Sequence, residues 1–232
     1  MSVISLRGIT KVYNHTSIPV RALNGVTVEV EKGEFTAIVG PSGSGKTTLL
    51  NIIGGLDTPT DGSVTIDGTN VSAMKGDELI EFRLNHIGFV FQAYNLIPVL
   101  TAAENVEFIM LLQGVKRQER EERTRELLRA VGLAERGHNR PSELSGGQQQ
   151  RVAVARALAS HPSFVLADEP TANLDSVAAE SLLEIMEHLN QEHGMTFLFS
   201  THDPRVMKRA HRILTLEDGL ITTDKSVDPH LS

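Results

Sequence analysis

The sequence predicts an α/β fold with a mostly parallel sheet, a smaller antiparallel sheet and a helical lobe. A glycine-rich loop at residues 40–47 stands between an apolar, strand-like run and a helix-like run. Strand and helix patterns alternate again after residue 160, which is typical of a parallel sheet covered on both faces. Between these regions, residues 93 to about 160 are rich in helical patterns, which indicates a helical lobe.

The composition limits the possible functions. The chain has 232 residues, 40% of them apolar, so it can bury the core of one sizeable domain. A formal net charge of −7 argues against a nucleic-acid binder, and the absence of cysteine excludes disulfides and thiolate metal sites. The first residues lack the apolar core of a signal peptide, and the longest stretch without a charged residue or histidine, Ile87 to Ala103, contains Gln92 and Pro98. We therefore expect a chain that reaches a membrane only through a partner.

The N-terminal part predicts short strands around the glycine-rich loop. Alternating apolar and polar residues indicate strands at Ile4 to Tyr13, Val26 to Val30 and Ser63 to Ile66, which suit a small antiparallel sheet. The apolar run Phe35 to Val39 predicts a buried strand that leads into the loop, and Thr48 to Ile53 predicts the helix that follows it.

The middle of the chain predicts mainly helices. Helical patterns cover Asp77–Leu84, Val106–Leu112, Lys116–Ala130 and Gln149–Ala159, and a short strand covers Ile87–Phe91. Thr101 and Glu104 have the spacing of a capping box, so we expect a helix to begin there.

The C-terminal part alternates strands and helices. Strands are predicted at Phe164–Ala167, Thr196–Phe199 and Ile213–Leu216, with helices at Ala178–His193 and Arg205–Ala210. The residues from Thr223 onward have no periodic pattern and are expected to form a loose tail.

The glycine-rich loop has the spacing and the strand–loop–helix context of a phosphate-binding loop. Glycines let the backbone curl so that N–H groups point at phosphates, and the following helix adds a partial positive charge. Lys46 supplies a cation, and the hydroxyl of Thr47 suits Mg²⁺. The predicted nucleotide-binding residues are Gly40, Pro41, Ser42, Gly43, Ser44, Gly45, Lys46, Thr47 and Thr48. The alternative is an ordinary glycine-rich connection.

Two acids follow the predicted strand Phe164–Ala167. Ligands of open parallel sheets gather at the carboxyl ends of strands, so Asp168 can hold Mg²⁺ there and Glu169 can act on the water that attacks a phosphate. The alternative is an acidic turn before Pro170.

A second anion site is predicted where Ser145, Gly146, Gly147 and Gln148 open a helix. Ser145 is a suitable N-cap, and the two glycines leave bare backbone N–H groups at a positive helix end. The alternative is a loop before a capped helix.

In combination, Leu144-Ser145-Gly146-Gly147-Gln148, the phosphate loop and the acid pair resemble the ATP-binding subunits of ABC transporters over nearly the whole chain. The resemblance implies one domain over residues 1–232, with a RecA-like P-loop core. Residues 1–92 and 161–223 would form this core with its antiparallel β subdomain, about 93–160 the helical subdomain, and 224–232 a tail. It also implies an ATP hydrolase that uses ATP and Mg²⁺. Two copies would pair head to tail, so that each ATP lies between one phosphate loop and the partner's signature segment, residues 145–148.

The resemblance assigns further roles one residue at a time. Gln92 and His202 would join Glu169 as catalytic residues, and Gln92 would also contact Mg²⁺ together with Thr47 and Asp168. Asp175 would lie in the loop that crosses the dimer interface, and Tyr13 would stack on adenine. The alternatives are a surface glutamine, a helix N-cap at Asp175 or Ser176, and a tyrosine that packs at a strand end.

The same resemblance implies a chain that drives a membrane permease and works at the cytoplasmic face of the cell membrane. The permease would dock near Gln92 to Pro98, where Tyr94, Leu96, Ile97 and Pro98 are expected to form an apolar groove unless they pack internally. Residues 55–62 and 87–92 resemble the lipoprotein-release and macrolide-export group, and the cell-division ATPase of that group is an alternative. A DNA-repair ATPase is a further alternative, although the chain lacks long insertions and is acidic. No guanine-recognition element Asn-Lys-x-Asp is present, which argues against a GTPase.

Overall fold

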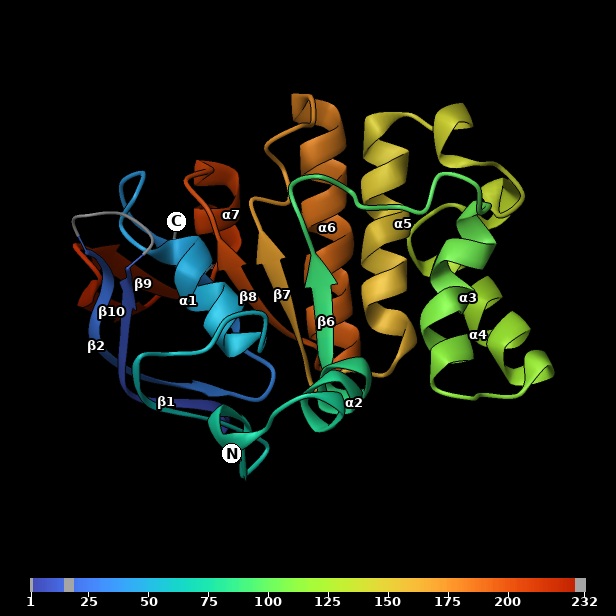
Figure 1. The fold of residues 1–232 in the computed structure, drawn as a ribbon. Coiled ribbons are helices and arrows are strands. Elements are labelled where there is room, and N and C mark those ends of the chain that lie inside the picture. Colours follow the sequence, from blue (N-terminus) through green and yellow to red (C-terminus); the bar gives the residue numbers. More distant parts are fainter. Residues whose placement is uncertain (1, 15–18, 228–232) are drawn as a thin grey trace.

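The computed structural model describes residues 2–14 and 19–227, and these form two sheets and a set of helices (Figure 1). The larger sheet has the strand order β10-β9-β3-β8-β7-β6, and only β10 runs antiparallel to its neighbour. Its strands are β3 (Phe35–Val39), β6 (Ile87–Val90), β7 (Phe164–Asp168), β8 (Thr196–Ser200), β9 (Arg212–Glu217) and β10 (Leu220–Ser226). The mostly parallel sheet predicted from the sequence is therefore confirmed.

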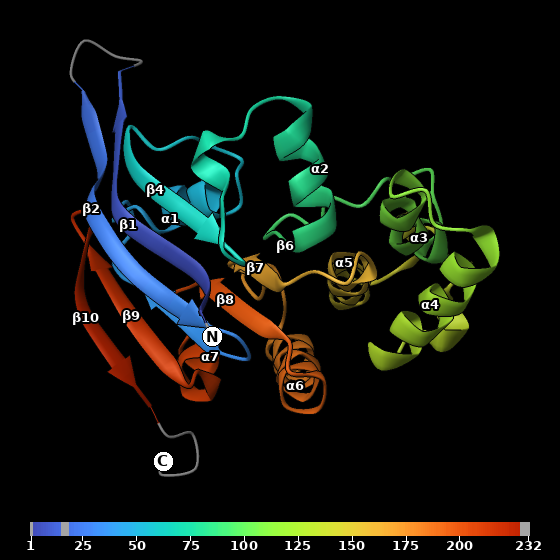
Figure 2. The ribbon, with the colours of Figure 1, turned by 90° about the horizontal axis from the view of Figure 1, so that it is seen from below.

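The smaller sheet is antiparallel, with the order β2-β1-β4-β5. Its strands are β1 (Ser2–Tyr13), β2 (Val20–Glu31), β4 (Asp61–Ile66) and β5 (Thr69–Asn70). Figure 2 shows β1 and β2 as long ribbons beside β9 and β10, on the side of the molecule that is remote from α3 and α4. This confirms the predicted small antiparallel sheet, and β2 extends further toward the N-terminus than the sequence pattern indicated.

The α-helices that the structure describes cover the larger sheet or form the helical lobe. They are α1 (Lys46–Ile53), α2 (Asp77–His86), α3 (Ala102–Leu112), α4 (Arg117–Ala130), α5 (Gly146–Ala159), α6 (Ser176–His193) and α7 (Pro204–Arg209). In Figure 2, α3 and α4 lie away from both sheets, and α5 lies between them and β7. The capping box of Thr101 and Glu104 is present at the start of α3, as predicted. The structure describes no helix whose length and apolarity would suit a membrane span.

The core lies on both faces of the larger sheet because side chains alternate along its strands. Phe35, Phe197 and Phe199 belong to the apolar cluster on the side of α6 and α7, and each is fully buried. Ile38 and Leu198 point the other way, into the cluster formed with α1 and the antiparallel sheet. The rings of Phe35 and Phe199 lie 4.6 Å apart. Burial of each such side chain contributes roughly 1.5–3 kcal/mol, which fixes the strands that carry the site.

The structure corrects the prediction of a loose tail from Thr223. Residues up to Ser226 continue β10, which pairs with β9, and Arg212 contacts Asp224 with its Nη2 atom 2.7 Å from Oδ2. No alternation of apolar and polar residues indicates this strand, because almost all of its side chains are exposed. Residues 228–232 of the predicted tail lie outside the described residues.

Candidate functional site

The phosphate loop connects β3 to α1 at the carboxyl edge of the larger sheet. Its backbone needs glycine at two positions. A Cβ atom on Gly40, at φ +152°, would lie 2.0 Å from the carbonyl oxygen of Leu216, and one on Gly45, at φ +105°, would lie 2.4 Å from that of Ala22. Gly45 is also the N-cap of α1 and provides no side-chain cap, so the first N–H groups of the helix keep their capacity to bind an anion.

Lys46 folds back over the loop that precedes it. Its Nζ atom donates hydrogen bonds to the carbonyl oxygens of Gly40, at 2.9 Å, and Pro41, at 3.0 Å. Both acceptors are neutral, and a phosphate oxygen would accept a stronger, charge-assisted hydrogen bond from the same ammonium group. The position of Lys46 therefore suits exchange of these contacts for a phosphate.

Thr47 and Asp168 meet although 121 residues separate them. The hydroxyl of Thr47 donates to Oδ1 of Asp168 over 3.3 Å, because α1 starts beside the end of β7. Gln92 lies just beyond β6. Because β6 and β7 are parallel and Val90 pairs with Ala167, the carboxyl ends of the two strands lie side by side. Hydroxyl, carboxylate and amide oxygens form the donor set that Mg²⁺ prefers.

Glu169 and His202 form a close pair at the same edge. Nδ1 of His202 lies 2.7 Å from Oε1 of Glu169, and the hydroxyl of Thr201 donates to Oε2 over 3.4 Å. The pair forms because Asp168 is aligned with Ser200 across the β7–β8 pairing. Glu169 has a φ of +46°, a conformation that is uncommon for a residue with a side chain and typical of functional turns.

Asp203 is linked to this pair through Thr201, whose hydroxyl accepts a hydrogen bond from the amide of Asp203, and the sequence analysis did not single it out. Oδ2 of Asp203 accepts a hydrogen bond of 2.6 Å from the hydroxyl of Thr171 and one of 2.7 Å from Nη2 of Arg205. Burial raises the pKa of Asp203, but the hydrogen bonds from Arg205 and Thr171 outweigh this effect and lower it to about 2. Asp203 is also the N-cap of α7 before Pro204, which is the signal that could have identified it.

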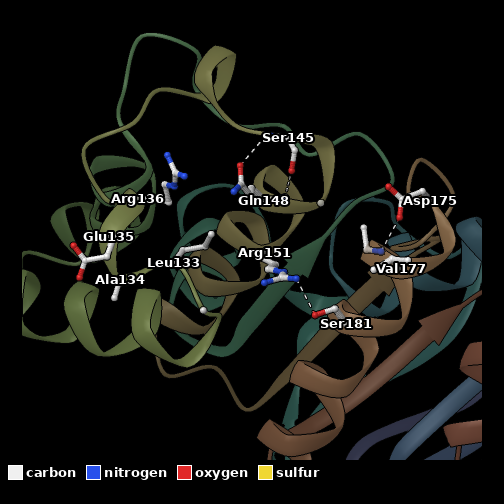
Figure 3. Close-up of a pocket in the computed structure, with 13 residues that line it drawn as sticks. Leu133, Ala134, Glu135, Arg136, Ser145, Gln148, Arg151, Asp175, Val177 and Ser181 are labelled. Carbon is white, nitrogen blue, oxygen red and sulfur yellow. Dashed lines mark hydrogen bonds between the residues drawn. The ribbon is translucent and has the colours of Figure 1, made fainter.

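The signature segment starts α5 as a capping box. The amide of Gln148 donates to Oγ of Ser145 over 3.3 Å, and Oε1 of Gln148 accepts from the amide of Ser145 over 2.9 Å. The predicted N-cap is confirmed, but the helix already begins at Gly146 rather than at Gln149. Ser145, Gln148 and Asp175 are among the residues that line a hollow of about 650 Å³ (Figure 3).

Asp175 caps the next helix of this region. Its Oδ1 atom accepts a hydrogen bond of 2.8 Å from the amide of Ala178, so the predicted alternative role as the N-cap of α6 is present. The start of α5 does not lie beside the phosphate loop, because in Figures 1 and 2 β7 separates α5 from α1. The two helix ends that the sequence predicts to bind anions therefore do not face each other within one chain.

Tyr13 ends β1 and is tied to neighbouring side chains. Its hydroxyl donates to Oδ2 of Asp57 over 2.7 Å, and Nζ of Lys11 lies 4.8 Å from the ring centroid. Burial, and to a smaller extent the contact with Asp57, raise the pKa of Tyr13. These contacts match the alternative of a tyrosine that packs at a strand end, and they leave the adenine-stacking role a prediction.

A groove of about 590 Å³ lies between α2, α3 and α5. It is lined by Ile80, Arg83, Leu84, Ile87, Gly88, Phe89, Phe91, Asn95, Ile97, Phe108, Ile109, Leu112, Arg156, Ala157 and Ser160. Arg156 donates to the carbonyl oxygens of Asn95, at 2.5 Å, and Tyr94, at 2.9 Å, and burial lowers its pKa.

The groove differs in part from the predicted one. Of the four apolar residues expected there, only Ile97 lines it. Leu96 packs against the core, and the hydroxyl of Tyr94 points toward the carbonyl oxygen of Asn173, 3.4 Å away. The segment forms no regular strand, since Asn95 has a φ of +50° and a turn begins at Pro98, so its apolar side chains do not share one face.

A parallel sheet that ends in a phosphate-binding loop, with carboxylates on the next strands, defines the class of P-loop nucleotide hydrolases. Within that class, residues 23–172 match the family described as ABC transporter. An uncharacterized ABC transporter ATP-binding protein of Thermotoga maritima is 51% identical over 219 residues, which are 94% of this chain and 93% of that protein. The chain therefore belongs to the ABC transporter family, as an ATP-binding cassette with the ATPase fold of its subunits.

Two further relatives describe the likeness more closely. The macrolide export ATP-binding/permease protein MacB of Hyphomonas neptunium is 47% identical over 96% of this chain, which spans only 34% of that protein. The dimeric structure of the cassette MJ0796 of Methanocaldococcus jannaschii, in a post-hydrolysis state with ADP and Pi, superposes with a TM-score of 0.89. It is 43% identical in sequence, and the match covers 97% of this chain and 99% of that one.

Proposed function

We propose that two copies of this chain bind two ATP molecules in a head-to-tail dimer, hydrolyse them, and thereby move a separate membrane permease of the export type. The observation that carries the dimer is the separation of α1 from α5 within one chain (Figure 1). A partner in the opposite orientation would place its signature segment, Ser145 to Gln148, against the phosphates held by Lys46. The dimer described for the related cassette MJ0796 supports this arrangement.

Within each site, Glu169 is the group that accepts a proton from the attacking water or orients it. His202, with Nδ1 2.7 Å from Oε1 of Glu169, holds that carboxylate and contacts the γ-phosphate. Phosphoryl transfer needs positioning and charge neutralisation more than covalent chemistry, and Lys46 and the N–H groups of α1 supply both.

Mg²⁺ would be held by Thr47 and Asp168, with Gln92 as a third oxygen donor. The 3.3 Å approach of Thr47 to Asp168 supports this donor set, since both are hard oxygen ligands near the start of α1. When bound, the ion neutralises charge on the phosphates. Tyr13 would lie against the adenine and Asp175 near the interface between the two copies.

The membrane partner is proposed to dock in the groove between α2, α3 and α5. Arg83 and Arg156 line this groove, and among the described residues no aspartate or glutamate does, although the whole chain has a net charge of −7. A short permease helix with apolar side chains and a carboxylate fits such a surface. The relatives named ATP-binding/permease proteins carry both functions in one longer chain, which supports a permease partner at the cytoplasmic face of the membrane.

Hydrolysis and dimer formation are tested together with the purified chain. We expect the purified chain to release phosphate from ATP. In ATP it should also form a species of twice the monomer mass in size-exclusion chromatography with light scattering. If the protein hydrolyses ATP but stays monomeric at every protein concentration, the proposed head-to-tail dimer is wrong. ADP serves as the control nucleotide, because it lacks the γ-phosphate that would bridge the two copies.

The docking groove is tested in gently solubilised membranes of the native host. Ile80, on α2, is 54% exposed and lines the groove, whereas Arg117, on α4, is exposed elsewhere. We expect an integral-membrane protein to co-purify with the tagged wild type and with Arg117→Glu, but not with Ile80→Glu. If only soluble or DNA-associated proteins co-purify with the wild type, the coupling to a permease is wrong.

A further inference from the structure

A single buried side chain links the segments that carry three of the predicted motifs. Gln150 lies on α5 and is fully buried. Its Nε2 atom donates to the carbonyl oxygen of Phe91 over 3.2 Å and to that of Pro170 over 2.8 Å. Phe91 directly precedes Gln92, and Pro170 directly follows Glu169. The amide group therefore holds the backbone beside two candidate catalytic residues.

The stability of the core alone does not explain a glutamine at this position. Within the described residues, Oε1 of Gln150 is buried and has no hydrogen-bond partner, and a buried unpaired amide oxygen costs free energy. Methionine would fill a similar volume without that cost. What glutamine provides, and methionine does not, is a donor group with two hydrogens that reaches two carbonyl oxygens at once.

The position of Gln150 on α5 adds a third connection. Gln150 follows Gln148 by two residues, so it belongs to the first turns of the helix that the signature segment begins. A further hydrogen bond holds the segment after β6, since Nδ2 of Asn173 donates to the carbonyl oxygen of Gln92 over 2.9 Å. A shift of α5 would consequently be transmitted to the ends of β6 and β7 by hydrogen bonds rather than by loose contact.

We infer that Gln150 is a positioning residue for ATP hydrolysis: it sets Gln92 and Glu169 relative to the signature helix. This inference rests on the proposed function. The hydrogen bonds that the structure describes for the side chain of Gln150 go to Phe91 and Pro170, and none goes to the phosphate loop or to the pair formed by Glu169 and His202. Its replacement should therefore change the geometry of hydrolysis and leave the nucleotide-binding residues in place.

Two substitutions separate positioning from packing. Gln150→Met keeps the volume and removes the two hydrogen bonds. Gln150→Glu keeps the shape, but an ionised carboxylate would face two carbonyl oxygens and repel them, whereas the protonated acid can donate one hydrogen bond. The activity of Gln150→Glu relative to the wild type should therefore rise as the pH falls. The titratable groups at the nearby strand ends, Asp168, Glu169, His202 and Asp203, are the same in both proteins, so each variant is compared with the wild type at the same pH.

The experiment measures kcat and KM for ATP in the purified chain at pH 6 and pH 8, with thermal unfolding as a check on folding. We expect Gln150→Met to lose about tenfold to a hundredfold in kcat, because a small misplacement of catalytic groups has an effect of that size, while KM changes by less than about threefold. For Gln150→Glu we expect a larger loss at pH 8 and partial recovery at pH 6.

Gln113 offers a matched control. Its Nε2 atom also donates to two backbone carbonyl oxygens, those of Leu84 and Ser160, both at 3.4 Å, and to Oδ1 of Asn85 at 3.0 Å, and all three acceptors lie outside the predicted motifs. Gln113→Met should leave kcat within about twofold of the wild type. Wild-type kcat in Gln150→Met, or a pH-independent ratio for Gln150→Glu, would overturn the inference while the proposed function stands. An inactive wild type would overturn the proposed function itself.

Discussion

Replacement of Glu169 by glutamine tests the chemistry of the site directly. In the structure, Oε1 of Glu169 contacts Nδ1 of His202 at 2.7 Å, and Oε2 contacts the hydroxyl of Thr201 at 3.4 Å. Glutamine has the same shape and keeps one oxygen acceptor, so the turn at φ +46° and the pairing of β7 with β8 are expected to persist. What the variant loses is the negative charge and the basic oxygen.

The size of the effect follows from the role of the lost group. Removal of a general base costs about 10²- to 10⁴-fold in rate, which corresponds to roughly 3–5 kcal/mol in the activation barrier. ATP affinity should change by less than about threefold, since Lys46 and the loop from Gly40 to Thr47 are untouched. With binding intact and hydrolysis slowed, the ATP-bound dimer should accumulate.

The assay combines phosphate release under single-turnover conditions with light scattering in ATP. Glu107→Gln is a matched control, because Glu107 has a similar side-chain exposure, 23% against 18% for Glu169, and forms an ion pair with Arg120 in the helical lobe. The control should hydrolyse ATP at the wild-type rate. A Glu169→Gln variant with a rate within threefold of the wild type, or one that stays monomeric in saturating ATP, would refute the reasoning.

Three further predictions concern binding and stability. Lys46→Ala should weaken ATP binding by about tenfold or more, because a charge-assisted hydrogen bond to phosphate is lost; calorimetry with ATP measures this, and unchanged affinity would contradict it. Gly45→Ala should abolish ATP binding because its Cβ would lie 2.4 Å from the carbonyl oxygen of Ala22, whereas Gly68→Ala, with a similar φ but no atom within 4 Å, should bind normally. Asp203 has a pKa of about 2 in the fold against an ordinary value of 3.8, so its ionised form stabilises the protein above about pH 4 by about 2 kcal/mol, and this is lost as the pH falls through 2. Urea unfolding should therefore show Asp203→Asn less stable than the wild type at pH 7 and nearly equal at the lowest pH where both fold, and a constant difference would argue against this linkage.

Much of the fold could be predicted because its signals are local. The strand–loop–helix order around Lys46 follows from a short apolar run, a glycine pattern and a helical pattern that are contiguous in the chain. The caps at Thr101 and Ser145 follow from side chains that bond to backbone three residues away. The polar edge strand β10 gave no such signal, since its existence depends on backbone pairing with β9.

The site was predictable to a different degree. Thr47, Asp168 and Glu169 were named from their sequence context and His202 from the family resemblance, and the structure brings them into two contacting pairs, Thr47 with Asp168 and Glu169 with His202. The residues behind them were not named. Gln150, for example, lies among other glutamines, and nothing in that run indicates which one is buried.

The sequence by itself determined the local features of this protein: the glycine-rich loop before α1, the acids after an apolar strand and the capped start of the signature helix. These depend on backbone conformation and neighbouring side chains within a few residues. The tertiary structure alone decided which distant groups meet, including Glu169 with His202, Gln150 with two strand ends, and the arginines that line the groove. The reason is that strand order and helix packing set these contacts, and a periodic pattern specifies which face of an element is buried without specifying its neighbour.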